Sequence, residues 1–352
     1  MTRTLLKEFK AAYRLKEANI NRQKLLQPMI SASLVLLFLV GCNAPATPTP
    51  TPIPPTATAT PPPAPTATEA PLPTATPVTP GNALATPTRA PTTAPAVSSS
   101  PCTAIGQTLR SSTDNADLVC VPAGEFLMGS ADSDKDAEDN EKPQHKVDLD
   151  AFWIDRTEVT NAQYNKCVQA GQCTASSYAS DPRYNGDTQP VVGVTWNDAT
   201  TYCEWAGRRL PTEAQWEKAA RGTDGRLYPW GNQMATCDYA VVAVAYDSET
   251  GCGKKTTWPV GSKPMGASPY GALDMAGNVW EWVEDRYDAE YYANSPSKNP
   301  TGPSSGSDRL LRGFGWYYDT GGVRAAYRGY ADPDTPLDYF GFRCVIGALP
   351  GG

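Results

Sequence analysis

A run of aromatic and charged side chains near the C-terminal end is the part of the sequence best suited to bind a ligand. Aromatic rings suit stacking on sugars and other planar groups, and tyrosine and arginine are favoured at protein interfaces because they combine contact area with a polar tip. The predicted ligand-binding residues are Trp316, Tyr317, Tyr318, Asp319, Arg324, Arg328 and Tyr330. The alternative is that Trp316, Arg324 and Arg328 stitch the core together, with only Tyr317, Tyr318 and Asp319 exposed.

Nucleophilic catalysis has little support, because His145 is the only histidine of the chain. A Ser-His-Asp or Cys-His arrangement would need this residue as its base, and it lies where a loop leads into a predicted strand. Metal ligation by cysteine is equally weak, since the sequence has no Cys-x-x-Cys pair. We therefore predict no catalytic residue.

An acidic loop contains Asp132, Asp134 and Asp136, with the alternate spacing of a calcium-binding EF-hand. The sixth position of that loop is Ala137, where an EF-hand needs glycine, and the twelfth is Pro143, where it needs glutamate. The sequence therefore predicts a solvated loop at this place.

Two strand patterns precede the helices. Residues 121–129 are typical of a strand, a turn and a second strand. The alternation of Val147, Leu149 and Ala151 with polar residues predicts a half-buried strand that continues into residues 152–155.

Capping residues predict three helices: one that starts at Thr160 or Asn161, one at Thr195 and one at Thr212, the last opened by a capping box. Beyond residue 222 the chain is rich in Gly, Pro, Trp and Tyr, which predicts loops and short strands. The expected fold class is α+β, with two principal helices and low regular secondary structure.

The N-terminal 100 residues are predicted to lie outside this domain. Residues 1–42 combine a basic region with a short apolar run that ends in Leu39-Val40-Gly41-Cys42, typical of a bacterial lipoprotein signal peptide with Cys42 as the lipidated residue. The alternative is an ordinary signal peptide with an incidental cysteine. Residues 43–100 are rich in Pro, Thr and Ala, which predicts a disordered, extended stalk. Residues 101–352 form the predicted domain.

Composition restricts the partners and the compartment. A net charge of −7 and a pI near 4.9 argue against nucleic acid, because phosphate binding relies on clustered Lys and Arg. The signal predicts an extracytoplasmic protein of the bacterial cell envelope, in contact with the membrane through its lipid anchor only.

Cysteine number supports export. Without Cys42 the chain has eight cysteines, an even number that indicates disulfides in an exported domain. Sequence spacing predicts the pairs Cys102–Cys120, Cys167–Cys173 and Cys237–Cys252.

Three sequence blocks carry a family resemblance: RRLPTEAQWE at 208–217, DMAGNVWEW at 274–282 and GFRC at 341–344. Together they resemble the formylglycine-generating enzymes, also called sulfatase-modifying factors, whose domain is an elaborated C-type-lectin-like fold. The resemblance implies a fourth disulfide, Cys203–Cys344. The second bridge of that family would need cysteines near Ala220 and Ala325, and the loss of both ends together supports the alignment.

The resemblance also implies one structural calcium ion, held by Asp274, Gly277, Val279 and Glu281. A hard cation prefers several oxygen ligands, and a glycine turn can present carbonyls between two carboxylates. The alternative is that Gly277 and Asn278 simply form a tight turn before two core tryptophans. We expect no second calcium, because Val241 and Cys252 lie where side-chain oxygens would be needed.

Formylglycine generation needs two thiolates that bind Cu(I), a soft ion. The approximate counterparts here are Tyr318 and a position near Gly322 and Val323, so no copper is expected. The sequence predicts a lipid-anchored protein whose domain binds a protein, peptide or glycan at the cell surface. One alternative is an oxidoreductase of the same superfamily with altered chemistry, and another is a structural role in envelope assembly.

Overall fold

The computed structural model describes residues 101–243, 250–318, 320 and 322–347. Their strands are β1 (Thr108–Arg110), β2 (Asp117–Val121), β3 (Gly124–Met128), β4 (His145–Leu149), β5 (Phe152–Asp155), β6 (Trp280–Arg286), β7 (Arg309–Arg312), β8 (Gly329–Ala331), β9 (Phe340–Phe342) and β10 (Val345–Ile346). The helices are α2 (Asn161–Gln169), α3 (Trp196–Trp205) and α4 (Glu213–Arg221), with short 3₁₀ turns η1 (Asp139–Glu141), η2 (Pro264–Gly266) and η3 (Tyr291–Ala293). The predicted signal peptide, Cys42 and the stalk lie outside the described residues.

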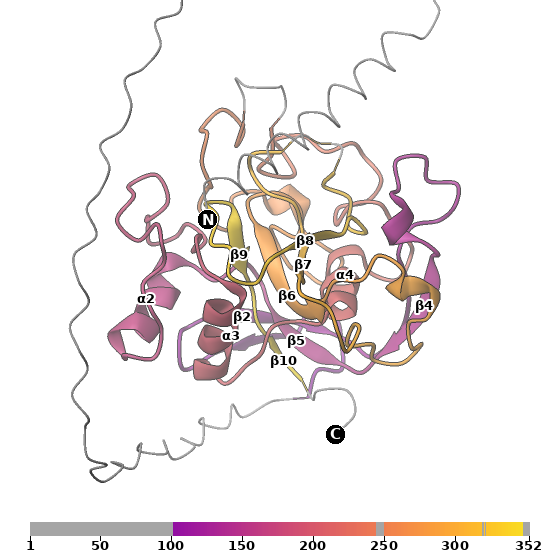
Figure 1. Ribbon diagram of the computed structural model, residues 1–352, viewed down its shortest axis with the longest axis horizontal. Coiled ribbons are helices and arrows are strands. Elements are labelled where there is room, and N and C mark those ends of the chain that lie inside the picture. Colours follow the sequence, from indigo (N-terminus) through magenta and orange to yellow (C-terminus); the bar gives the residue numbers. More distant parts are fainter. Residues whose placement is uncertain (1–100, 244–249, 319, 321, 348–352) are drawn as a thin grey trace, which may run out of the picture. The chain divides into compact units, whose positions relative to one another are not determined.

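The strands form three small sheets. Their orders are β1-β2-β5-β10, β3-β4 and β8-β7-β6-β9, and all neighbours are antiparallel except β6 and β9. C-terminal strands enter two of the sheets, as the yellow segments of Figure 1 show. The mixed helices and strands, joined by long irregular segments, confirm the predicted α+β fold class.

One predicted strand is two strands in the structure. β4 pairs with β3, whereas β5 lies between β2 and β10 in another sheet. The chain changes sheet at Asp150, whose N–H donates to Asn299 Oδ1 at 2.9 Å. The alternation of hydrophobic residues continues across this corner, and for that reason periodicity alone did not reveal it.

The helices begin where their capping residues predict. Thr160, Thr195 and Thr212 are the N-caps, and each helix starts with a complete capping box. Within the described chain the three α-helices have nearly equal lengths, so the prediction of two principal helices was wrong. Helix α4 contacts β3, β4, β6 and β7, and its buried apolar residues pack into one of the two large core clusters.

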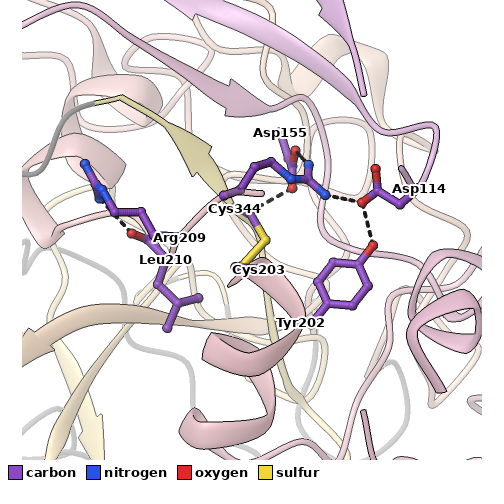
Figure 2. The surroundings of a disulfide bond; sticks show 8 residues. Asp114, Asp155, Tyr202, Cys203, Arg209, Leu210 and Cys344 are labelled. Atoms are coloured by element: carbon purple, nitrogen blue, oxygen red, sulfur yellow. Dashed lines mark hydrogen bonds and ion pairs between the residues drawn. A yellow bond between two sulfur atoms is a disulfide. The ribbon is translucent and has the colours of Figure 1, made fainter. Parts of the chain in front are cut away.

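Four disulfides staple the irregular segments: Cys102–Cys120, Cys167–Cys173, Cys203–Cys344 and Cys237–Cys252. All four predicted pairings are confirmed. Figure 2 shows the Cys203–Cys344 disulfide, which joins α3 to the residue just before β10. Next to it, the Cys344 N–H donates to Asp155 Oδ2 at 2.9 Å. Beside it, Arg208 donates to both Asp155 and Asp114, so this link between distant segments is both covalent and ionic.

Buried charge is paired around helix α4. Glu213 and Glu217 accept from Arg312 at 2.8 and 2.7 Å, and Arg328 donates to Glu213 at 2.7 Å. Asp285, at the end of β6, accepts from the Glu213 N–H at 2.8 Å. Burial, reinforced by the negative charge of Glu213, raises the pKa of Asp285 to about 8.

Replacing Asp285 with asparagine is expected to make stability less dependent on pH. In the unfolded chain this carboxyl loses its proton near pH 4, whereas the folded protein retains it up to about pH 8. Between these values the native state binds more protons, so its stability falls as pH rises. Urea unfolding at pH 6 and pH 8 should show the wild type losing about 2 kcal/mol more than Asp285→Asn, whose side-chain oxygen still accepts from Glu213. Equal losses would contradict the assignment.

None of the helices in the described part of the chain is long and apolar enough to cross a membrane.

Candidate functional site

The segment from Phe314 to Tyr318 leaves the end of β7 and carries the predicted ligand-binding aromatics. Trp316 is buried, and its main-chain N–H donates to the Asn278 carbonyl at 2.8 Å. Tyr317 follows with 55% of its surface exposed. Its ring meets the rings of Trp316 and Tyr318 edge to face, with centroids 5.5 and 5.8 Å away. A buried tryptophan therefore supports an exposed tyrosine, which can stack on a ligand.

Tyr318 belongs to an aromatic cluster rather than to an ionic centre. Its ring lies 4.9 Å from Phe314, 5.6 Å from Tyr339 and 6.2 Å from Trp280, measured between centroids. Burial, and then the neighbouring Tyr339, raise the pKa of the Tyr318 hydroxyl. The group stays neutral at physiological pH, so it contributes a ring to the cluster and no phenolate.

The turn at Gly277 and Asn278 positions the segment from Phe314 to Tyr318. Both residues have positive φ, 80° and 62°, and a Cβ on Gly277 would lie 2.6 Å from the Val241 carbonyl oxygen. The Asn278 side-chain oxygen accepts from the main-chain N–H of Trp258 at 2.9 Å. The main-chain carbonyl of Asn278 accepts from the main-chain N–H of Trp316. The tight turn foreseen from the sequence is present, and it holds two tryptophans at fixed places.

Arg324 and Arg328 do not belong to the ligand surface. Arg324 is buried and binds both oxygens of Glu141, at 2.6 and 2.7 Å, which fastens the acidic loop. Asp134 of that loop also lies 3.5 Å from Arg324. Arg328 is buried between Glu213 and the Asn140 carbonyl. Because their donors are taken up inside the protein, the prediction that they bind ligand is corrected, and the alternative that they stitch the core holds.

The remaining predicted ligand-binding residues are Tyr330 and Asp319. Tyr330 is 44% exposed on β8 and stacks on Tyr287, with centroids 3.9 Å apart. None of its ring contacts in the described chain is with Trp316, Tyr317 or Tyr318. Asp319 lies outside the described residues. The structure thus brings together Trp316, Tyr317 and Tyr318.

The four positions predicted for calcium surround buried charge. Glu281 accepts from Arg343 at 2.6 and 2.7 Å and from Trp216 Nε1 at 2.8 Å, and Asp274 accepts from the Gly261 N–H at 2.5 Å. Arg343 thus already supplies positive charge to Glu281. No group of three or more His, Cys, Asp or Glu in the described ranges is arranged to hold a metal ion. The prediction of calcium at Asp274, Gly277, Val279 and Glu281 rests on the resemblance and stays a prediction.

No free thiol is present among the described residues, because their eight cysteines form the four disulfides. His145 lies on β4, where its ring packs edge-on to Tyr292 with centroids 4.9 Å apart. Neither feature provides a nucleophile or a soft metal ligand.

Residues 106–348 match the family model described as "Sulfatase-modifying factor enzyme 1-like domain". The chain belongs to this family. Among its relatives, the formylglycine-generating enzyme of Streptomyces coelicolor is 35% identical, in a match that covers 64% of this chain and 88% of that protein. The hercynine oxygenase of Mycolicibacterium smegmatis is 30% identical over 64% of this chain and 60% of that protein. Family members of oxidase type are therefore among its relatives.

Solved structures show the same fold. PvdO from Pseudomonas aeruginosa superposes with a TM-score of 0.60 and 27% identity, covering 69% of this chain and 98% of that protein. The Treponema denticola variable protein 1 gives 0.55 at 23% identity, covering 68% and 98%, a likeness of fold alone. The recognition of the sulfatase-modifying factor fold from three sequence blocks is confirmed.

Sequence reasoning missed Trp258 as a neighbour of the aromatic segment. Its indole Nε1 donates to the Gly251 carbonyl at 2.8 Å, and the Gly251 N–H donates to the Trp316 carbonyl at 2.8 Å. A usable signal was the dipeptide Lys254-Lys255 close to this tryptophan, a local positive charge in an acidic chain.

Proposed function

We propose that this chain is an exported, lipid-anchored protein of the bacterial cell envelope that binds a protein, peptide or glycan at the cell surface through its domain. The binding surface is centred on Tyr317. The observation that carries the proposal is this exposed ring, which lies on a buried tryptophan and beside a cluster of further rings. Aromatic groups that are rigidly held make effective binding contacts, since little side-chain entropy is lost when the ligand arrives.

The same proposal excludes copper-dependent formylglycine generation. The approximate counterpart of one copper-binding thiolate is Tyr318, whose ring is packed among Phe314, Trp280 and Tyr339. All cysteines of the described residues are in disulfides. The phenol of Tyr318 and the main-chain amides near Gly322 and Val323 are poor ligands for Cu(I).

Replacing Tyr317 with alanine is expected to weaken ligand binding about tenfold or more, the usual effect of removing an aromatic anchor. The full chain, purified in detergent, would be screened on arrays of glycans and peptides, and the hits measured by calorimetry. Tyr330→Ala is the matched control, because it removes another exposed tyrosine that stacks elsewhere. Loss of binding in the control with none in Tyr317→Ala would move the binding surface to β8.

The second candidate is an oxidoreductase of the superfamily with altered chemistry, and it is favoured by relatives named formylglycine-generating enzyme and hercynine oxygenase. Incubation of the full chain with Cu(I), oxygen and a cysteine-containing peptide tests whether it retains any oxidation of cysteine. If the chain only binds its ligand, the peptide stays unchanged. Conversion of the cysteine to an aldehyde would support the oxidoreductase, and metal analysis of the same sample would measure calcium.

A further inference from the structure

Two lysines lie over the indole ring of Trp258. The Lys254 Nζ is 3.6 Å from the ring centroid and the Lys263 Nζ is 4.1 Å from it. Each contact is a favourable cation–π interaction, but two positive charges that share one ring repel each other. Partial burial, together with the charge of Lys254, lowers the pKa of Lys263. The pair is therefore a local concentration of positive charge.

This charge is not neutralised within the described part of the protein. Neither Lys254 nor Lys263 forms an ion pair there. Asp238 and Asp274 act on Lys263 electrostatically, but neither makes a salt bridge with it. Lys255 is also exposed next to the pair, although the whole chain carries a net charge of −7. An anion placed at Trp258 would relieve the repulsion.

The lysine pair is built on a rigid support. Trp258 is fixed by three hydrogen bonds: its main-chain N–H donates to Asn278 Oδ1, its carbonyl accepts from Asn278 Nδ2, and its indole N–H donates to the Gly251 carbonyl. The disulfide Cys237–Cys252 ties down the loop two residues before Lys254. Since the loop is held before any ligand binds, ordering it costs little free energy on association.

The same supports connect the lysines to the surface around Tyr317. Asn278 and Gly251 each hydrogen-bond to both Trp258 and Trp316, and Trp316 supports Tyr317. Trp258 also packs against the buried cluster that contains Trp316. The lysines and the exposed tyrosine are therefore attached to one continuous support, Trp258 packed with the cluster of Trp316.

We propose that Lys254 and Lys263 form an anion subsite beside Tyr317 and that the ligand of this protein is an acidic glycan, bearing carboxylate or sulfate groups. This inference rests on the proposed binding function and specifies its ligand. A sugar ring stacks on Tyr317 while its acidic group lies between the ammonium groups, which act as point charges and demand no fixed fork geometry.

An acidic peptide that binds by adding a strand fits less well, because that mode needs free main-chain groups on the protein. Around Trp258 the main-chain groups are already used: the Gly251 N–H and carbonyl bond to Trp316 and Trp258, and the Trp258 carbonyl accepts from Asn278. What the loop offers to a ligand is cationic side chains and rings.

The test measures binding of the full chain to galacturonate and sulfated hexasaccharides by calorimetry. The fully methyl-esterified galacturonate hexamer is the neutral control, and poly-glutamate of equal charge is the peptide control. We expect at least one acidic hexasaccharide to bind, and Lys254→Gln/Lys263→Gln to weaken it about tenfold. Lys135→Gln/Lys298→Gln, which removes two exposed lysines elsewhere, should bind as the wild type does. Affinity should also fall with added salt, and less so in the first variant.

The outcomes separate the two proposals. If the acidic sugars bind no better than the methyl ester, or if the Lys254 and Lys263 variant binds them as the wild type does, the anion subsite is wrong. The binding function then stands if a neutral ligand still requires Tyr317. If poly-glutamate binds more tightly than both acidic sugars, the ligand is an acidic peptide and the glycan assignment fails. If neither acidic sugar binds, and the array screen yields no ligand that depends on Tyr317, both proposals fail.

Discussion

Replacing Cys203 and Cys344 together with alanine is expected to lower the free energy of unfolding by about 5 kcal/mol. This disulfide joins residues 141 positions apart, the largest separation among the four bridges of the described residues. A link across so long a loop removes the most conformational freedom from the unfolded chain. Both cysteines are also fully buried, so the truncation leaves unfilled space in the core.

The matched control is the pair Cys167 and Cys173, whose bridge spans only 6 positions. Its removal is expected to cost about 2 kcal/mol, because a short loop loses little freedom when it is closed. Urea unfolding of both variants, followed by circular dichroism, measures the difference. Equal losses for the two pairs would show that loop length does not set the stabilisation, and that local contacts around each bridge do.

The disulfides and the helix starts could be predicted because their signals are local or specific to the family. Three bridges join cysteines close in sequence, and the capping boxes at Thr160, Thr195 and Thr212 lie within a few residues of chain. The pairing of Cys203 with Cys344 needed the resemblance, since spacing does not connect positions so far apart.

The site could be predicted only in part, because exposure depends on the packing of distant segments. Arg324 and Arg328 look like ligand-binding residues in the sequence, yet Glu141 and Glu213 approach them from far along the chain. Likewise, Trp258 becomes a neighbour of Trp316 through Asn278 and Gly251, which each hydrogen-bond to both tryptophans. In the sequence, an arginine close to tyrosines looks the same whether it binds a ligand or pairs with a buried carboxylate.

One position of the family resemblance, Tyr318, has a clear packing role in the described chain. Where the resemblance places a thiolate, Tyr318 adds a ring to an aromatic cluster with Phe314 and Tyr339. The ion pair between Glu281 and Arg343 belongs to the surrounding scaffold and involves none of these rings. One fold supports many chemistries and binding functions, so function follows from the residues of the site and not from the fold alone.

The ion network on helix α4 supplies the other large expected effect. Arg312 is fully buried and bridges Glu213 and Glu217, while its guanidinium also donates to the Ala325 carbonyl at 2.6 Å. Arg312→Met is expected to lower the free energy of unfolding by about 3–5 kcal/mol, because two carboxylates lose a shared partner in a site without water access. Arg328 and Arg221 still pair with Glu213 and Glu217 in this variant, but neither of them bridges the two carboxylates as Arg312 does.

Urea unfolding of three variants tests the origin of that loss. Arg110→Met removes an exposed pair with Asp117 and should cost less than about 1 kcal/mol, because solvent screens that interaction. Arg312→Lys keeps the positive charge but loses the planar fork that reaches both glutamates at once, so its stability should lie between those of Arg312→Met and the wild type. If Arg312→Lys were as unstable as Arg312→Met, geometry rather than charge would hold α4 to β7. If Arg312→Met cost no more than Arg110→Met, the network would contribute little to stability and would serve only to fix the orientation of the helix.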